Sequence, residues 1–246
     1  MPDFRNMKLG RKAVKTDTRT LRLSRYLTAE LPAPPPSVDW TKGITQWGMM
    51  LNDSLGDCTI AALGHAIQVW TANTGAETTV PDSVILGAYE AWDGYVPNDP
   101  STDNGGVELD VLNKFKQQGL AGEQLLAFAD PQASNLTEVQ QSIALFGGVY
   151  IGITLTNAQL QQQVWDVIPN DDSGIAGGHA VFVPKYDTDG SFTCITWGEL
   201  MKMTPAFWQS AVDEVHTLLS PAWIAANGAP SGFDLSQLQT DLAAIQ

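Results

Sequence analysis

The sequence predicts an α+β fold, in which helices come first along the chain and an antiparallel sheet follows. Apolar residues recur on nearly all sides of residues 57–73, which is typical of a helix buried in a core. Shorter helical patterns follow at residues 81–92, 109–118 and 136–145. The β-rich runs that come next are residues 149–153, 179–183 and 191–196, with turn residues at 187–190.

The first 36 residues differ in composition from the rest of the 246-residue chain. Residues 1–30 carry eight Lys and Arg against three acids, a net charge of +5, whereas residues 31–246 carry −19. Residues 31–36 are rich in proline and therefore stiff and extended. We expect a basic arm and linker over residues 1–36 and one folded body over residues 37–246.

The basic arm has several possible roles. It could lie on the chain's own body as an inhibitory segment, dock on an acidic neighbouring subunit, bind nucleic acid, or remain a solvated tail. The body itself is strongly acidic and repels nucleic acid, so a nucleic-acid partner is expected only through the arm.

Composition also bears on compartment and cofactors. Two cysteines are too few for a disulfide framework, no apolar run is long enough to cross a membrane, and the charged N-terminus does not fit a secretory signal. A cytoplasmic location, or assembly in a particle, is therefore expected. The three His and two Cys do not cluster at ligand spacing, and the glycine pairs lack the setting of a phosphate loop, so we expect no metal and no cofactor.

Cys58 and His179 are the candidate catalytic residues. Cys58 starts the buried helix, where the helix dipole favours a thiolate, although a lone cysteine there can also be plain core. His179 begins a strand after two glycines. His65 lies two turns beyond Cys58 along the helix, and His216 is expected on the surface of a late helix. If Cys58 has a base, His179 is therefore the candidate.

Five segments together resemble the papain-like cysteine peptidases, in the family's order and near its spacings. They are Val38-Asp39-Trp40 with Asn52-Asp53-Ser54-Leu55-Gly56-Asp57-Cys58, Asp103-Asn104-Gly105-Gly106, residues 136–152, Gly178-His179-Ala180-Val181, and Thr196-Trp197-Gly198. The resemblance covers residues 37–198. It implies a papain-like two-lobe fold, with a helical lobe over about residues 50–130 and a β lobe over about residues 131–200.

The resemblance also implies a mechanism and a site. Cys58 would be the thiolate nucleophile, and His179 its imidazolium partner and then the general acid. The Cys58 backbone N–H and the side chain of Asn52, which stands where the family has glutamine, would form the oxyanion hole. Trp197 would shield the pair, and Gly105 and Gly106 would line the substrate cleft.

The sequence departs from the family's pattern in several places. Ile195 stands where the orienting asparagine is expected, which would leave the Nδ1–H of His179 without its acceptor, and strand alternation is expected to turn Thr196 to the opposite face. Leu55 and Asp103 occupy positions where such enzymes often carry half-cystines. Beyond residue 200 we expect extra C-terminal helices, over residues 204–246, in place of the family's closing strands.

Two functions from different classes fit these observations. One is a papain-like thiol hydrolase of weak or narrow activity, acting on peptide or isopeptide bonds of a peptide or protein substrate. The alternative is a catalytically impaired papain-like scaffold that serves as a structural or interaction subunit of a viral particle or other large assembly, tethered by residues 1–30. The intact Cys58 and His179 favour the first, whereas Ile195, Asn52 and the basic arm favour the second.

Overall fold

The structure is a computed structural model that describes residues 4–17, 21–26, 33–228 and 234–244. Residues 1–3, 18–20 and 27–30 of the arm and residues 31 and 32 of the proline-rich segment lie outside this range. The helices are α1 (Cys58–Thr74), α2 (Asp82–Asp93), α3 (Glu108–Gln118), α4 (Leu136–Phe146), α5 (Pro205–Ala211), α6 (Pro221–Asn227) and α7 (Leu235–Ala244), with 3-10 turns at Leu23–Arg25, Pro100–Thr102 and Gln159–Gln161. The strands are β1 (Val38–Asp39), β2 (Ala127–Ala129), β3 (Val149–Thr156), β4 (Val164–Trp165), β5 (Ile175–Tyr186), β6 (Phe192–Thr196), β7 (Glu199–Met203) and β8 (Val212–Leu219).

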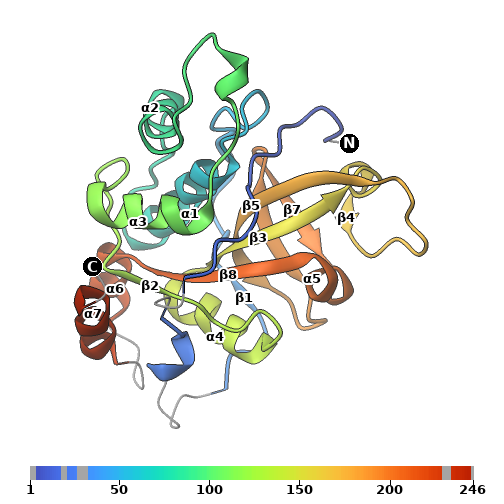
Figure 1. Ribbon diagram of the computed structural model, residues 1–246. Coiled ribbons are helices and arrows are strands. Elements are labelled where there is room, and N and C mark those ends of the chain that lie inside the picture. The colour runs from blue at the N-terminus through green and yellow to red at the C-terminus, as the bar shows by residue number, and fades with distance from the viewer. Residues whose placement is uncertain (1–3, 18–20, 27–32, 229–233, 245–246) are drawn as a thin grey trace.

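The predicted α+β class is confirmed, with α1 to α3 grouped on one side and the sheet on the other (Figure 1). Helix α1 is buried from Cys58 through Trp70, which explains the apolar residues on all its sides. It packs against β5 and is tied to α4 by the Trp70 indole N–H, which donates to the Phe146 carbonyl at 3.1 Å. The buried helix thus carries Cys58 to the boundary between the two halves.

The sheet runs in the order β2-β8-β3-β5-β6-β7-β4, with β1 also paired to β5. All pairs are antiparallel except β4 with β7. Ala180, Phe182 and Ile195 face the core that contains α1. Val181, Val183 and Cys194 face a second core on the opposite side, which also contains Phe207 of α5. Strand alternation therefore assigns each residue of β5 and β6 to one of two cores.

The expectation of helices throughout residues 204–246 is wrong for residues 212–219. Thr204 does cap α5, since its hydroxyl accepts from the Phe207 N–H at 3.1 Å. The chain then enters strand β8, which lies between β2 and β3 in the interior of the sheet. Asp213, Glu214 and His216 interrupt the apolar pattern of this strand, which is why alternation did not reveal it. Among the described residues, no helix combines the length and apolar character that a bilayer crossing requires.

Candidate active site

Cys58 lies in a closed environment at the N-terminus of α1. Its side chain is 1% exposed, its sulfur accepts a hydrogen bond from the Ala180 N–H at 3.4 Å, and the Gly10 backbone also lies against it. Burial raises the pKa of the thiol to about 12. Burial therefore outweighs the helix dipole, which alone would favour the thiolate, and Cys58 is a neutral thiol in this state.

His179 is placed beside Cys58 by strand β5, because Ala180, which binds the sulfur, directly follows it. The indole of Trp197 is stacked on the imidazole, with ring centroids 4.4 Å apart and planes inclined by 17°. Burial, with smaller contributions from His65 and Arg11, lowers the pKa of His179 to about 3. The imidazole is therefore neutral, and among the described residues its Nδ1 has no hydrogen-bond partner.

Thr196 orients the imidazole, contrary to the sequence expectation that it faces away. Its hydroxyl lies 2.7 Å from Nε2 of His179, whereas Ile195 packs into the α1 core. The register between β5 and β6 shifts by one residue between Phe182 and Lys185, so counting along the strand misplaces side chains by one position. The shift puts Thr196, and not Ile195, on the face that carries His179.

The loop before Cys58 holds Asn52 in a tight conformation. Met50 and Leu51 have φ values of +56° and +65°, which are uncommon for residues with side chains. The Asn52 amide Nδ2 donates to the Leu55 carbonyl at 3.1 Å, and the side chain is buried. The structure thus places Asn52 in the wall next to Cys58, with its amide engaged in its own loop.

Asp103 connects this loop to the glycine segment. Its Oδ1 accepts from the Gly56 N–H at 2.9 Å and from the Tyr89 hydroxyl at 2.7 Å, and the Gly105 N–H donates to the same hydroxyl at 2.9 Å. These hydrogen bonds link the Cys58 loop to the segment that carries Gly106, where the resemblance leaves a framework disulfide missing. A half-buried carboxylate therefore supports this wall by hydrogen bonds in place of a covalent bridge.

The N-terminal arm lies against the segments that carry Cys58 and His179. In Figure 1 it runs as a blue segment between the helices and the strands β5 and β8. Gly106 donates to the Gly10 carbonyl at 2.8 Å and accepts from the Lys12 N–H at 2.8 Å, while the Arg11 N–H donates to the Gly178 carbonyl at 3.0 Å. Residues 10–12 are therefore paired as an extended strand with both sides of the cleft.

Close packing explains why Gly10 is a glycine. A Cβ on Gly10 would lie 1.7 Å from the Gly56 carbonyl oxygen, which is far inside van der Waals contact. Further along the arm, the Trp197 indole N–H donates to the Lys8 carbonyl at 3.3 Å, and the ring of Phe4 lies 4.9 Å from that of Trp197. The arm thus covers the Cys58–His179 pair from one end of the cleft to the other.

Arg11 enters a buried acidic cluster with its side chain 2% exposed. Its Nε lies 3.0 Å from Glu108 Oε1, one terminal nitrogen lies 2.8 Å from Glu214 Oε2, and the guanidinium also binds Asp213. Burial and the neighbouring Glu214 carboxylate raise the pKa of Glu108. The positive charge on Arg11 counteracts that cost, as a buried cation among carboxylates must.

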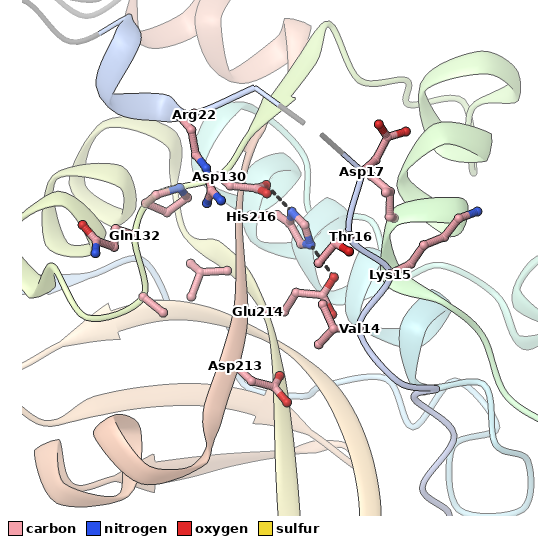
Figure 2. A pocket seen from close by; sticks show the side chains of 14 residues that line it. Val14, Lys15, Thr16, Asp17, Arg22, Asp130, Gln132, Asp213, Glu214 and His216 are labelled. Atoms are coloured by element: carbon pink, nitrogen blue, oxygen red, sulfur yellow. Dashed lines mark hydrogen bonds and ion pairs between the residues drawn. The ribbon is translucent and has the colours of Figure 1, made fainter. Parts of the chain in front are cut away.

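His216 belongs to the same cluster, so its expected place on the surface of a late helix is wrong. It lies in strand β8, 2% exposed, with Nδ1 2.5 Å from Asp130 Oδ1 (Figure 2). Its Nε2 lies 3.4 Å from Glu214 Oε1 and 3.6 Å from Glu108 Oε2. Although burial opposes the charged form, these carboxylates raise its pKa, and His216 is a second cation in the cluster.

The acidic cluster has the spacing of a metal site. Glu108, Glu214 and His216 bring one ligand atom each within 4.8 Å of one another. In this structure the guanidinium of Arg11 contacts two of these three side chains and supplies positive charge. The other histidine, His65, is engaged elsewhere, with Nε2 2.8 Å from the Gly48 carbonyl.

Asp57 is buried next to Cys58 and yields a pH prediction. Burial raises the pKa of its carboxyl to about 8, and the contact with the Asn52 side chain offsets this only in part. Because the carboxyl pKa is higher in the folded than in the unfolded chain, the free energy of unfolding falls as the pH rises from the unfolded-state pKa toward 8. The raised pKa values of Glu108 and His216 act in the same direction. The lowered pKa values of His65 and His179 make stability rise with pH, but only at pH values below about 6.5.

We therefore expect the free energy of unfolding to fall as pH rises from 6.5 to 8.5. Asp57→Asn should raise the free energy of unfolding at pH 8.5 by about 1–3 kcal/mol and flatten the decline, because it removes a buried carboxylate charge. Urea denaturation at several pH values measures this. Glu90→Gln, at an exposed position of α2, is the control and should change little. An equal effect of both variants would contradict the prediction.

No protein-family model and no curated protein matches the sequence. Among solved structures, xylellain, a cysteine protease from Xylella fastidiosa, is similar with a TM-score of 0.69 and 14% identity, over 89% of this chain and 98% of that one. Procathepsin B S9 from Trypanosoma congolense gives 0.61 and 10%, over 89% and 88%. Procathepsin L 3 of the Tenebrio molitor larval midgut gives 0.60 and 10%, over 88% and 77%. The chain therefore has the papain-like fold that the sequence predicted.

Proposed function

We propose that this chain is a papain-like thiol hydrolase that cleaves peptide bonds with Cys58 and His179, and that its own arm holds it in a latent state. The observation that carries the proposal is the extended segment 10–12, which is paired through its backbone with Gly106 and Gly178 directly over Cys58. A cleft that binds one extended peptide by its main-chain groups is suited to bind another.

The chemistry would begin when a substrate replaces the arm. His179 accepts the thiol proton through Nδ1, which has no other partner among the described residues, while Thr196 holds Nε2. The Cys58 sulfur attacks the substrate carbonyl carbon, and the oxyanion is stabilised by the Cys58 N–H and by the Asn52 amide, which exchanges its contact with Asp57 for the oxyanion. Imidazolium returns its proton to the leaving amine, the C–N bond breaks, and water then hydrolyses the thioester.

The arm-covered state is not suited to this chemistry. The thiol has a pKa of about 12 and the imidazole a pKa of about 3, so the proton stays on sulfur. Both shifts have burial as their largest cause, and the arm contributes to it, since Gly10 lies against Cys58 and Arg11 against Gly178. The arm's hydrogen bonds fall on the chain's own cleft, which favours a latent hydrolase over a subunit tethered to its neighbours.

Labelling with an epoxide inhibitor of papain-like enzymes, read by intact mass and peptide mapping, tests the proposal. In a chain with Gly10→Val, whose added side chain the Gly56 carbonyl cannot accommodate, we expect alkylation of Cys58 that is lost when His179→Ala is added, because the epoxide requires an activated thiolate. Cys194→Ala is the matched control, since Cys194 is also a buried free thiol but lies in the second core. Labelling that is indifferent to His179, or that falls on Cys194, would refute the assignment.

A further inference from the structure

The pocket that holds the Arg11 side chain is built into the body and not into the arm. Its charged walls are Glu108 at the start of α3 and Asp213 and Glu214 on β8. Arg11 reaches it from the arm residue next to Gly10, with its backbone between Gly106 and Gly178. Any extended peptide that takes the arm's place would put one side chain into this pocket.

The pocket has room for a flat, polar side chain beside strand β3. A Cβ on Gly152 would lie 2.2 Å from Arg11 Nε and 2.4 Å from its Cζ, so the missing side chain of Gly152 provides the space. Gly152 is opposite Glu214 in the pairing of β3 with β8, which sets the open space beside the carboxylate. The guanidinium therefore lies flat over the strand at the one position without a side chain.

The charges of the pocket require a cation. The Glu108 side chain is 0% exposed and that of Glu214 is 9% exposed, and Arg11 contacts both. When the arm leaves, Glu214 keeps only His216 as a cation among the described residues, and Glu108, whose pKa burial already raises to about 8 beside Arg11, is left as a protonated acid near neutral pH. A buried carboxylate without sufficient counter-charge is strongly unfavourable, so an apolar side chain would be a poor replacement.

The geometry distinguishes arginine from lysine as well. One terminal nitrogen of Arg11 donates to Glu214 and both terminal nitrogens donate to Asp213, whereas Nε lies 3.0 Å from Glu108 Oε1 as an ion pair without a hydrogen bond. Two adjacent carboxylates bound by the two terminal nitrogens match a guanidinium fork. A lysine ammonium is a single point of charge and cannot make these paired contacts.

We propose that this pocket is the specificity site of the hydrolase and that it selects substrates with an arginine at the residue that replaces Arg11. That arginine peptides are cleaved rests on the proposed function. That the pocket prefers arginine is a property of binding alone and does not depend on cleavage. In the latent state Arg11 is then a substrate mimic supplied in cis. Gly152, Glu108 and Glu214 determine the selectivity.

A binding experiment tests the pocket without requiring turnover. The protein is the full chain with Gly10→Val, which the Gly56 carbonyl cannot accommodate, Arg11→Ala to empty the pocket, and Cys58→Ala to prevent chemistry. The probe is a synthetic peptide with the sequence of residues 6–16, compared by calorimetry with peptides carrying Lys or Leu in place of the arginine. We expect the arginine peptide to bind at least about tenfold more tightly than the leucine peptide, with lysine between them.

Variants of the pocket make the test specific. Asp213→Asn changes a side chain that is 45% exposed, so it should fold, and it should reduce the arginine preference while leaving the leucine peptide unaffected. Gly152→Ala should abolish the preference by filling the space. Equal affinities of the arginine and leucine peptides, or no binding of the arginine peptide at millimolar concentration, would overturn the proposal.

The proposed function can fail separately. With Cys58 restored, selective binding of the arginine peptide without any cleavage would support the selectivity of the pocket and contradict the proposed hydrolase activity. Cleavage of leucine peptides as fast as arginine peptides would support the hydrolase activity and contradict the proposed selectivity for arginine.

Discussion

Gly10→Val is expected to raise the rate of Cys58 alkylation at neutral pH by about 10²–10³-fold. The added side chain would overlap the Gly56 carbonyl, so residues 10–12 must leave the cleft. Removal of that cover would return the thiol pKa from about 12 toward its ordinary value of 9.0 or below, which increases the thiolate fraction at neutral pH by about a thousandfold. Stopped-flow or quenched alkylation with iodoacetamide, mapped to Cys58, measures the rate.

Val14→Ala is the matched control, since Val14 lies on the arm at 40% exposure and away from the Cys58 contact. Its alkylation rate should equal that of the unchanged chain. A Gly10→Val variant that stays folded but alkylates no faster would contradict a covering role for the arm.

Thr196→Val is expected to lower Cys58–His179 reactivity by about 10–10²-fold in the Gly10→Val chain, measured with the same epoxide. Valine has the shape of threonine but cannot hydrogen-bond Nε2 of His179, so the imidazole loses its orienting partner. Thr196→Ser keeps the hydroxyl and should retain most of the rate. If the valine and serine variants were equally reactive, Thr196 would have no orienting role.

Ile195→Asn tests whether the residue that orients His179 is at position 196, as the structure has it, or at position 195, as the family resemblance implies. Because Ile195 faces the α1 core, asparagine there should not restore an orienting contact. It should instead destabilise the chain by about 2–4 kcal/mol through an unpaired buried amide and lost packing. A gain in reactivity from Ile195→Asn would mean that the strand register around His179 differs from the one described.

Local patterns predicted the elements that position the pair. The all-round apolar residues of 57–73 identified α1, and the small number of histidines singled out His179 as the base for Cys58. Trp197 and Gly106, chosen through the resemblance, lie against His179 and the arm respectively. These features depend on residues close in sequence or on motif order, both of which one sequence can show.

The features that the sequence did not reveal depend on pairing between distant segments. Thr196 was misassigned because a register shift in β5 and β6 is invisible to a residue count. The acidic cluster joins Arg11 to residues 108 and 213–214, and no local pattern connects them. Asp213 and Glu214 interrupt the apolar pattern of β8, and the same two side chains bind Arg11 of the arm.

The pH dependence of Cys58 alkylation in the Gly10→Val, Cys194→Ala chain tests the central claim most directly, that Cys58 and His179 act as one thiolate–imidazolium pair. The account predicts substantial reactivity persisting below pH 7, where an isolated thiol is protonated, and loss of that acidic limb in His179→Ala. A single ionisation near 9 that is the same with and without His179 would contradict it.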